Sequence, residues 1–430
     1  MPLFLFFDGR VIFLKIVHPI CCGIDVHKKV IVATIAATDK NNITLYATQS
    51  FSTFNCDLFR FRDWLLENDC KHACMESTGK YWIPVFNILE EHVCTILTHP
   101  KYVRSIKGKK TDKKDSKWIA DLFKFDMVRS SFIPPKDIRT LRELARYRFK
   151  LVAMRSSEKN RYQNAMTVSN IALASILTDP FGKTAKGIME HLLSSAVFNE
   201  EYCKSLIQKS AKKKTELIIE SVRDCHIESD QSFKMNEASR HMAYLDQMIL
   251  RTEAELFVRI QPYYHFVELL AQIPGISELS AALIIAEIGA DMSVFESSKH
   301  LVSWAGLTPA NNESAGKKKS VRISKAGQFL KPLLVQCALA AVKSGKEPYF
   351  AVKYHKLKKR RGHKKAIIAI ARMMLTCVYN MMTTGEAWNP SDHKDYDSPF
   401  IRKQEFSEES AIAFLAAQGY DVSALVKKAV

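Results

Sequence analysis

Four carboxylates among the first 130 residues occupy settings suited to binding a metal ion. Asp25 closes a short apolar run, and Glu76 follows a second one. Asp112 and Asp115 are three residues apart in a lysine-rich stretch. Acids that emerge from strand ends, together with two on one helical turn, can converge on a hard cation such as Mg²⁺. Because metals held by carboxylates commonly cut phosphodiesters, these residues predict chemistry on nucleic acid.

The pair Asp112 and Asp115 has a second interpretation. The segment 116–125 has helical spacing, so both acids stand at the N-terminal approach of a helix. Acids at that end also interact favourably with the helix dipole or cap the helix. Metal binding and capping therefore both stay open for this pair.

A serine is the second candidate for chemistry. Ser314 lies in a polar, glycine-containing loop that also holds Ser320 and Ser324. The cations of this loop are Lys317, Lys318, Lys319, Arg322 and Lys325. A hydroxyl is a weak nucleophile until a neighbour activates it, and the same features suit a loop that only grips phosphate. Both roles serve phosphodiester chemistry.

Composition points to a polyanionic partner. The chain has 430 residues, which allows roughly two to four domains. Its formal net charge is +18, and nucleic acid is the leading partner for so basic a chain, although a merely basic housekeeping protein is the alternative. The basic residues gather in 101–117, 209–214, 317–331 and 343–365, whereas the segment after Trp388 is acidic. This segregation favours a binding surface over uniform solubilising charge.

Other signals exclude some classes of protein. The ten cysteines include no CxxC pair, so neither a zinc site nor a secreted disulfide framework is indicated, and reduced cytosolic thiols are expected. No uninterrupted apolar run approaches about 20 residues, so no membrane span is expected. The apolar first 15 residues lack the basic start and cleavage site of a signal peptide, and we expect a poorly packed leader there.

The elements that must position these residues differ along the chain. Residues 16–136 alternate short β-branched runs with helical spacing, which predicts an α/β domain. Helices are predicted over 137–178 and about 233–260, with a mostly helical insertion between them, so 137–262 is expected to form an antiparallel coiled-coil arm. The first of these helices should break at Asp179-Pro180.

The part from 263 to 388 is predicted to be mainly helical. Ile273-Pro-Gly-Ile forms a tight turn before a helix capped near Ser277, and such helix–hairpin–helix turns can point backbone N–H groups at a phosphate, although an ordinary helical hairpin is as consistent. In the basic stretch after Lys343, aromatics alternate with cations and could stack on bases. The aromatics are Tyr349, Phe350 and Tyr354, and the cations include Lys358, Lys359, Arg360 and Arg361. The segment 389–430 forms an acidic tail.

Several motifs resemble those of one family. Cys22-Gly-Ile-Asp-Val-His-Lys-Lys, Met75-Glu-Ser-Thr-Gly-Lys-Tyr-Trp and Lys110-Thr-Asp-Lys-Lys-Asp-Ser-Lys are similar to the N-terminal domain of the DEDD insertion-sequence transposases. Ile273-Pro-Gly-Ile, Leu307-Thr-Pro, Ser314-Ala-Gly and Arg322-Ile-Ser-Lys-Ala-Gly resemble that family's C-terminal domain. The resemblance covers about residues 16–388 in the right order and spacing, and the motifs are specific as a set.

The resemblance implies a RuvC-like N-terminal domain with an RNase H fold. Asp25, Glu76, Asp112 and Asp115 would form its acidic tetrad and bind a divalent metal, Mg²⁺ or Mn²⁺. Ser314 would attack DNA and form a covalent phosphoserine link. Members act as homo-oligomers, here a dimer or tetramer, on the DNA of element ends and target, and some are guided by a bridge RNA. The implied location is the bacterial cytoplasm, near the nucleoid, and no membrane is involved.

One departure from the family pattern concerns the serine loop. The family usually follows the serine with glycine, whereas Ala315 precedes Gly316 here. Alanine cannot adopt positive φ freely, so Ser320 or Ser324 becomes a fallback nucleophile.

Three alternatives to a recombinase remain from the sequence. A metal nuclease resembling a Holliday-junction resolvase would use the acids and only grip phosphate with Ser314. A non-enzymatic nucleic-acid-binding protein would need no acids. A sugar kinase of the actin-like class shares the strand–Asp opening but would require glycine-rich phosphate loops that this sequence lacks.

Overall fold

The computed structural model describes residues 4–7, 10–13, 15–77, 79–103, 111–195, 197–309, 312–314, 317–320, 323–324, 326–344 and 348–390. Only the backbone is described for 4–7, 10–13, 101–102, 312–314 and 317–320. Arg322, Lys325 and nearly all of the expected acidic tail lie outside the described residues. The chain divides into two compact units, Met1–Pro134 and Pro135–Val430, and each is described by itself.

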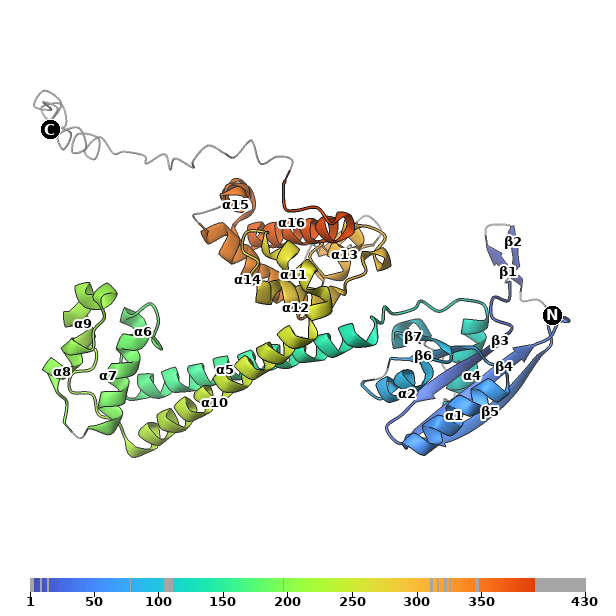
Figure 1. The fold of residues 1–430 in the computed structure, drawn as a ribbon, viewed down its shortest axis with the longest axis horizontal. Helices are drawn as coiled ribbons and strands as arrows, with labels where there is room; N and C mark the ends of the chain where they lie inside the picture. Colours follow the sequence, from blue (N-terminus) through green and yellow to red (C-terminus); the bar gives the residue numbers. More distant parts are fainter. Residues whose placement is uncertain are drawn as a thin grey trace, which may run out of the picture. The chain divides into compact units, whose positions relative to one another are not determined.

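A mixed five-stranded sheet forms the centre of the first unit (Figure 1). Its order is β5-β4-β3-β6-β7. The strand β4 runs antiparallel to its neighbours β3 and β5, whereas β6 and β7 run parallel to β3. The bounds are β3 (Ile20–Val26), β4 (Val30–Thr38), β5 (Thr44–Ser52), β6 (His72–Glu76) and β7 (Cys94–Thr98). This mixed sheet agrees with the RNase H-like fold expected for residues 16–136.

Helices cover both faces of this sheet. The helices α1 (Asn55–Glu67) and α2 (Trp82–Leu89) pack on one face, where Phe61 and Leu65 meet Ile24 and other strand residues. On the opposite face α4 (Asp112–Lys124) packs against β3 and β4, and the short α3 (Pro100–Val103) precedes it. Since side chains alternate along a strand, residues of β3 two positions apart share the α4 face.

The described backbone of the first residues contains a hairpin, and their role as a leader outside the domain stays a prediction. The strands β1 (Phe4–Phe7) and β2 (Arg10–Phe13) pair antiparallel in a two-stranded sheet of their own. The sequence analysis did not predict this hairpin, although Asp8-Gly9 between two apolar runs is a recognised turn signal.

The second unit contains two long helices that lie side by side (Figure 1). They are α5 (Lys136–Val168) and α10 (Ser229–Arg259). Ion pairs join Arg148 to Glu253 and Arg155 to Asp246, so the two helices run antiparallel. Leu151, Leu245 and Ile249 fill the seam between them.

The first long helix ends about ten residues earlier than the sequence predicted. Asn170 has a φ of 54°, and the Ile171 N–H donates to the Met166 carbonyl oxygen at 2.9 Å. This is a Schellman stop, supported by burial of Met166 and Ile171 in the same cluster. The break at Asp179-Pro180 was therefore the wrong signal, because an asparagine in the left-handed conformation had already ended the helix.

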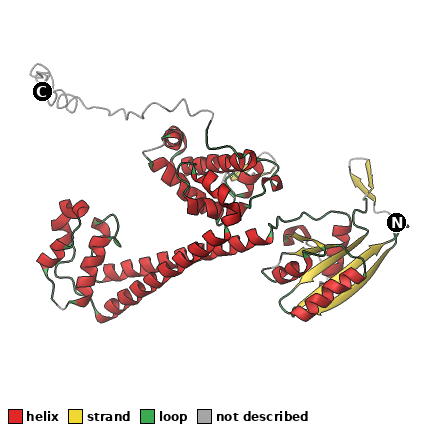
Figure 2. Cartoon of the chain, viewed as in Figure 1, coloured by secondary structure: helices red, strands yellow, loops and turns green. Residues whose placement is uncertain are grey.

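Short helices at one end of this pair form a separate apolar cluster. They are α6 (Leu173–Ile176), α7 (Lys183–Ser194), α8 (Glu200–Ser205), η1 (Lys209–Lys214) and α9 (Thr215–Glu220). The name arm is used below for α5 to α10. Figure 2 shows that the described part of the second unit is helical apart from one small hairpin.

The other end of the long pair joins a large helical core. Its elements are η2 (Gln261–Tyr263), α11 (Tyr264–Ala271), α12 (Glu278–Ile288), η3 (Met292–Val294), α13 (Ser298–Trp304), β8 (Asn312–Ser314), β9 (Lys317–Ser320), α14 (Leu330–Lys343), α15 (Tyr349–Arg361) and α16 (His363–Thr384). Helix α16 alone among the described helices is long and apolar enough to cross a membrane. Half of its apolar window is buried in the unit, as in a core helix.

Candidate metal centre and serine hairpin

The ends of two adjacent strands place the first two acids. Ile24 on β3 pairs with Met75 on β6, and the strands are parallel. Asp25 and Glu76 therefore follow as neighbours at the same edge of the sheet. This arrangement comes from the sequence itself, since each acid terminates an apolar run that is buried in the sheet.

The start of α4 places the other two acids. Thr111 caps this helix, and its side chain accepts a hydrogen bond from the Lys114 N–H. Asp112 and Asp115 thus occupy the first turn, three residues apart on one face. The sequence placed the helix start at 116 and left capping open for these acids. The structure gives the N-cap position to Thr111 instead.

Close packing holds α4 against the sheet. A Cβ atom on Gly23 would lie 2.2 Å from the Ser116 carbonyl oxygen and 2.3 Å from the Ala120 nitrogen. Only glycine allows this approach of helix to strand. The hydroxyls of Thr34 and Ser116 are also hydrogen-bonded at 2.7 Å, in a buried position. These contacts fix the acidic turn of α4 near the end of β3.

A histidine joins the acids of the strand and the helix. The His27 Nε2 lies 3.2 Å from Asp25 Oδ2 and 3.5 Å from Asp112 Oδ1. One ligand atom from each of these three residues lies within 4.8 Å of the others. Glu76 and Asp115 do not belong to this group, although Asp115 is near enough to influence Asp25 electrostatically.

The electrostatics of Asp25 favour the binding of a cation. Burial raises the pKa of the Asp25 carboxyl above its ordinary value. His27 opposes this rise in pKa, whereas the charges of Asp112 and Asp115 add to it. A half-buried carboxylate crowded by two others is stabilised by a cation. The donor set, two carboxylates and an imidazole, fits a divalent metal.

The sequence reasoning did not single out His27 as a site residue. The signal was present, because His27 is two residues after Asp25 and hence on the same face of the strand. Of the motif Cys22-Gly-Ile-Asp-Val-His-Lys-Lys, only Asp25 was taken as a site residue. The imidazole's contact with Asp112 depends on the packing of α4, which spacing along the chain does not reveal.

The candidate nucleophile lies in the second unit, away from these acids in the chain. Ser314 ends β8, and its backbone pairs with Lys317 on β9. Residues 315 and 316, including the alanine that departs from the family pattern, lie outside the described residues. The fallback residue Ser320 ends β9, and Ser324 follows the hairpin.

The base of this serine hairpin is tightly locked. Gly306 and Gly327 have φ angles of 69° and 67°, and each lies against the backbone of the residue that precedes the other, Ala326 and Ala305, respectively. A Cβ on Gly327 would meet the Ala305 carbonyl oxygen at 2.1 Å. The ammonium group of Lys331 donates to the Ser324 carbonyl oxygen at 2.6 Å and lies 3.4 Å from that of Gly306. Partial burial lowers the pKa of Lys331.

The predicted Pro-Gly turn is present before α12. Ser277 caps the helix through a hydrogen bond from the Ser280 N–H at 3.2 Å. Gly275 has a φ of 89°, and a Cβ there would lie 2.4 Å from the Cys337 carbonyl oxygen. One side of the turn is therefore packed on α14. Its predicted contact with phosphate stays a prediction.

The predicted basic surface requires one correction. Tyr349, Phe350 and Tyr354 are buried in the core, so they are not available to stack on bases. Their spacing is that of the buried face of α15. The sequence analysis interpreted the same spacing as aromatics that alternate with cations on one binding surface. The cations Lys358, Lys359, Arg360 and Arg361 are exposed at the end of α15.

These cations continue into the next helix. Lys364 and Lys365 are exposed in the first turn of α16, where positive charge opposes the helix dipole. Positive charge at this end destabilises the helix slightly, so its presence favours a role in binding an anionic partner. The six residues 358–361 and 364–365 are called the basic corner below. Lys317, Lys318 and Lys319 lie on β9, where only the backbone is described.

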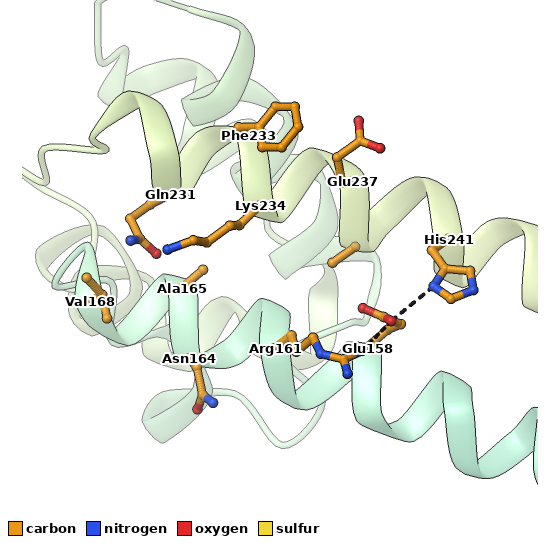
Figure 3. Close-up of a pocket in the computed structure, with 11 residues that line it drawn as sticks. Glu158, Arg161, Asn164, Ala165, Val168, Gln231, Phe233, Lys234, Glu237 and His241 are labelled. Carbon is orange, nitrogen blue, oxygen red and sulfur yellow. Dashed lines mark hydrogen bonds and ion pairs between the residues drawn. The ribbon is translucent and has the colours of Figure 1, made fainter.

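A cavity elsewhere in the molecule offers no comparable chemistry. It has a volume of about 650 Å³ and lies between α5 and α10 on the arm (Figure 3). Glu158, the buried acid beside it, is bound by Arg161 and by His241 Nδ1, the latter at 3.0 Å. This carboxylate is already neutralised, so the contact locks the two helices together. The acidic edge of the first unit remains the candidate metal centre.

Comparisons with known proteins match two parts of the chain, the first of which extends from the first unit through α5 of the second. A DEDD transposase model of the IS110 type, described as a transposase, matches residues 22–170. A second model, described as the transposase IS116/IS110/IS902 family, matches residues 267–355. The chain belongs to the DEDD-type insertion-sequence transposases. The first match contains all four acids and His27, and the second contains the serine hairpin.

Individual relatives of this transposase family support the same assignment. A pilin gene-inverting protein of Moraxella bovis is 33% identical over 30% of this chain and 41% of its own length. That of Moraxella lacunata is 28% identical over 46% and 61%, respectively. The transposase for insertion sequence element IS1111A of Coxiella burnetii is 29% identical over 27% and 32%. The matched part thus spans about a third to three fifths of each relative. The family's DEDD domain implies dependence on a divalent metal.

Proposed function

We propose that this protein is a DNA recombinase that excises and inserts an insertion sequence. The observation that carries the proposal is the convergence of Asp25, Asp112 and His27 at one sheet edge, in a chain of the DEDD transposase family. Two of the relatives are named for inverting a gene, which is also a rearrangement of DNA. The DNA substrates would be the element ends and the target.

The four acids would hold the metal and the scissile phosphate. A divalent ion, Mg²⁺ or Mn²⁺, would supply charge stabilisation at the phosphoryl oxygens. Asp25 and Asp112 face the same space through His27, and Glu76 and Asp115 would complete the set from the neighbouring strand and the same helical turn. Asp25 is the most enclosed of the measured ligands, with its side chain 14% exposed against 54% for Asp112.

Ser314 would make the attack. Its Oγ would form a bond to phosphorus while the bond from phosphorus to a deoxyribose oxygen breaks. The serine proton leaves, and the departing oxygen takes up a proton. In the second step a hydroxyl of the recipient strand attacks the phosphoserine and releases Ser314. The number of phosphodiester bonds is conserved, so no energy source is needed.

The two halves of this chemistry lie in different units of the chain. We therefore expect assembly as a homo-oligomer, a dimer or a tetramer, that joins acids and serine in one site. The basic corner would contact nucleic acid by its charge, and a guide RNA encoded in the element is an attractive ligand for it. Binding should then weaken steeply with salt.

The test is the covalent adduct. Purified protein, divalent metal and end-labelled element DNA are separated on a denaturing gel. We expect a protein–DNA adduct with the unmodified protein, and an amount of adduct about a thousandfold lower or less with Ser314→Ala. Ser320→Ala and Ser324→Ala serve as matched controls and should retain it. An adduct that persists in Ser314→Ala would reject this serine as the nucleophile.

A metal nuclease is the second candidate. The four acids of the tetrad and His27 all belong to the first unit, so metal-dependent cleavage would not require the serine of the second unit. It predicts cleaved DNA with free ends and no adduct, and cleavage that depends on Asp25 but not on Ser314. A non-enzymatic role predicts DNA binding that is unchanged by Asp25→Asn. The same gel, repeated with both variants, separates the three possibilities.

A further inference from the structure

His27 differs from the four acids in both chemistry and position. It follows the last residue of β3, and its N–H donates to the Val30 carbonyl oxygen at 2.9 Å, closing the turn into β4. The hydroxyl of Thr53 donates to the Lys28 carbonyl oxygen at 3.0 Å and braces the same turn. The backbone that carries the imidazole is therefore fixed by the sheet.

The ring nitrogen occupies a ligand position between two carboxylates. Its separations from the nearest oxygens of Asp25 and Asp112 are 3.2 Å and 3.5 Å. Adjacent ligands of one ion, each about 2.1 Å from it, lie about 3.0–3.5 Å apart in octahedral or tetrahedral geometry. Both separations from His27 thus match those of adjacent ligands of one divalent ion, and the three ligand atoms lie within 4.8 Å of one another.

We propose that His27 is a direct nitrogen ligand of the metal, alongside Asp25 and Asp112, and that it makes the centre prefer transition-metal ions such as Co²⁺ or Mn²⁺ over Mg²⁺. This inference rests on the proposed metal-dependent function. A nitrogen ligand raises the affinity for first-row transition ions, more for Co²⁺ and Zn²⁺ than for Mn²⁺, whereas Mg²⁺ favours oxygen ligands and retains its water. An all-carboxylate centre would lack this selectivity.

A competing role for His27 is to donate a hydrogen bond to Asp25 and orient it from outside the coordination sphere. The two roles differ in one observable. A ligating nitrogen couples to the electron spin of bound Mn²⁺, whereas a ring one shell further out couples far more weakly. Pulsed electron paramagnetic resonance on the Mn²⁺-loaded full chain detects that coupling without any assay of DNA.

The chain offers a matched control. His226 Nε2 lies 3.3 Å from Glu228 Oε1, much like the contact of His27 with Asp25, but no third ligand accompanies that pair among the described residues. His226 is in the second unit and its side chain is 82% exposed. The His27 side chain is 47% exposed, so His27→Ala should also fold. Circular dichroism and the melting temperature check both variants.

We expect a nitrogen coupling in the unmodified protein and in His226→Ala, and its loss in His27→Ala. The Mn²⁺ dissociation constant should rise about 100-fold or more in His27→Ala, at or beyond the upper end of what loss of an outer-shell partner costs, and that for Mg²⁺ should change less. Mn²⁺ bound without nitrogen coupling would overturn the role of His27 while leaving the acidic centre intact. Failure to bind either Mn²⁺ or Mg²⁺ would overturn the metal centre itself, and with it the proposed function.

Discussion

Asp25 in the first unit and Glu287 in the second are both carboxylates removed from solvent, Asp25 in part and Glu287 fully, but their surroundings differ in charge. Glu287 at the end of α12 is paired with Arg146, whose Nε and Nη2 lie 2.8 and 3.0 Å from its two oxygens. Among the described residues, His27 is the one group that offsets the charge of Asp25, which is crowded by Asp112 and Asp115. The first acid is neutralised by an arginine within the fold, whereas the surroundings of the second favour binding of a cation. Compensation, rather than burial, separates a structural acid from a candidate ligand.

The surroundings of Glu287 explain why it is structural. Arg142 donates to the carbonyl oxygens of Ala286 and Glu287, at 3.2 and 2.6 Å, and so caps the C-terminal end of α12. Burial lowers the pKa of Arg142 to about 10, which leaves it charged at neutral pH. The guanidinium of Arg146 also stacks on Phe329. These contacts fasten α5 to the helical core.

The largest effect should follow from breaking the compensated pair. Arg146→Ala leaves the Glu287 carboxylate buried without its bidentate partner. We expect a loss of about 2–4 kcal/mol in the free energy of unfolding, less than for a fully buried pair because Arg146 is 35% exposed. Urea unfolding measures this loss. Arg240→Ala, which breaks the exposed pair with Glu237, is the control and should change stability by less than about 0.5 kcal/mol.

A metal should stabilise only the uncompensated site. At 100 times its dissociation constant, a bound ion adds about 2.7 kcal/mol to the stability of the unit that holds it. Hydrogen exchange with and without Mn²⁺ should therefore slow in β3 and α4 but not in α12. Equal slowing in α12, or none in α4, would contradict the contrast drawn between the two acids.

The contrast also depends on the position of α4. Gly23→Ala inserts a methyl group within 2.3 Å of α4 backbone atoms, so the helix must shift and carry Asp112 away from Asp25. We expect a loss of about 1–3 kcal/mol and weaker Mn²⁺ binding. Unfolding and calorimetric titration measure the two effects. Gly187→Ala, whose added methyl would only touch Leu206 side-chain atoms at 3.5 Å or more, should preserve both.

The smallest expected effect is the change in stability with pH that comes from the Asp25 carboxyl. Because the pKa of Asp25 is raised in the fold, its contribution to stability is present at low pH and is lost as pH rises through the folded-state pKa. Asp25→Asn should therefore stabilise the metal-free protein at pH 7 and lose that advantage near pH 4. Urea midpoints in chelator at both pH values measure this.

Asp57 provides the opposite case in the same unit. Hydrogen bonds from Ser52 and then Arg60 lower the pKa of Asp57, so its contribution to stability is present at neutral pH and lost as pH falls through the folded-state pKa. Asp57→Asn should thus destabilise the protein at pH 7. If both asparagine variants shift stability in the same direction, the surroundings of Asp25 do not act as described.

Much of the first unit was predictable from local patterns. Short β-branched runs gave the strands, and helical spacing gave α1 and α2. The acids were found because each follows an apolar run. Contacts between distant segments were not predictable, since neither the approach of α4 to Gly23 nor the meeting of His27 with Asp112 has a signature along the chain.

The errors in the second unit have physical causes as well. The end of α5 was missed because asparagine in the left-handed conformation is a weaker signal than Asp-Pro. The aromatics of α15 were assigned to nucleic acid because a cation-rich helix hides which face is buried. The predicted domain boundaries, the role of Ser314 and the contacts of the basic corner stay predictions.

Helix α5 links two apolar clusters without interruption. Its first turns belong to the large helical core and its last turns to the cluster at the tip of the arm. With 33 residues, it is about 50 Å long. Along a continuous helix each residue adds a rotation of about 100°. One residue inserted near the middle of α5 would therefore turn its last turns by about 100° about the helix axis relative to its first turns. The length of this helix, counted in residues, therefore sets the direction in which the tip points as well as its reach.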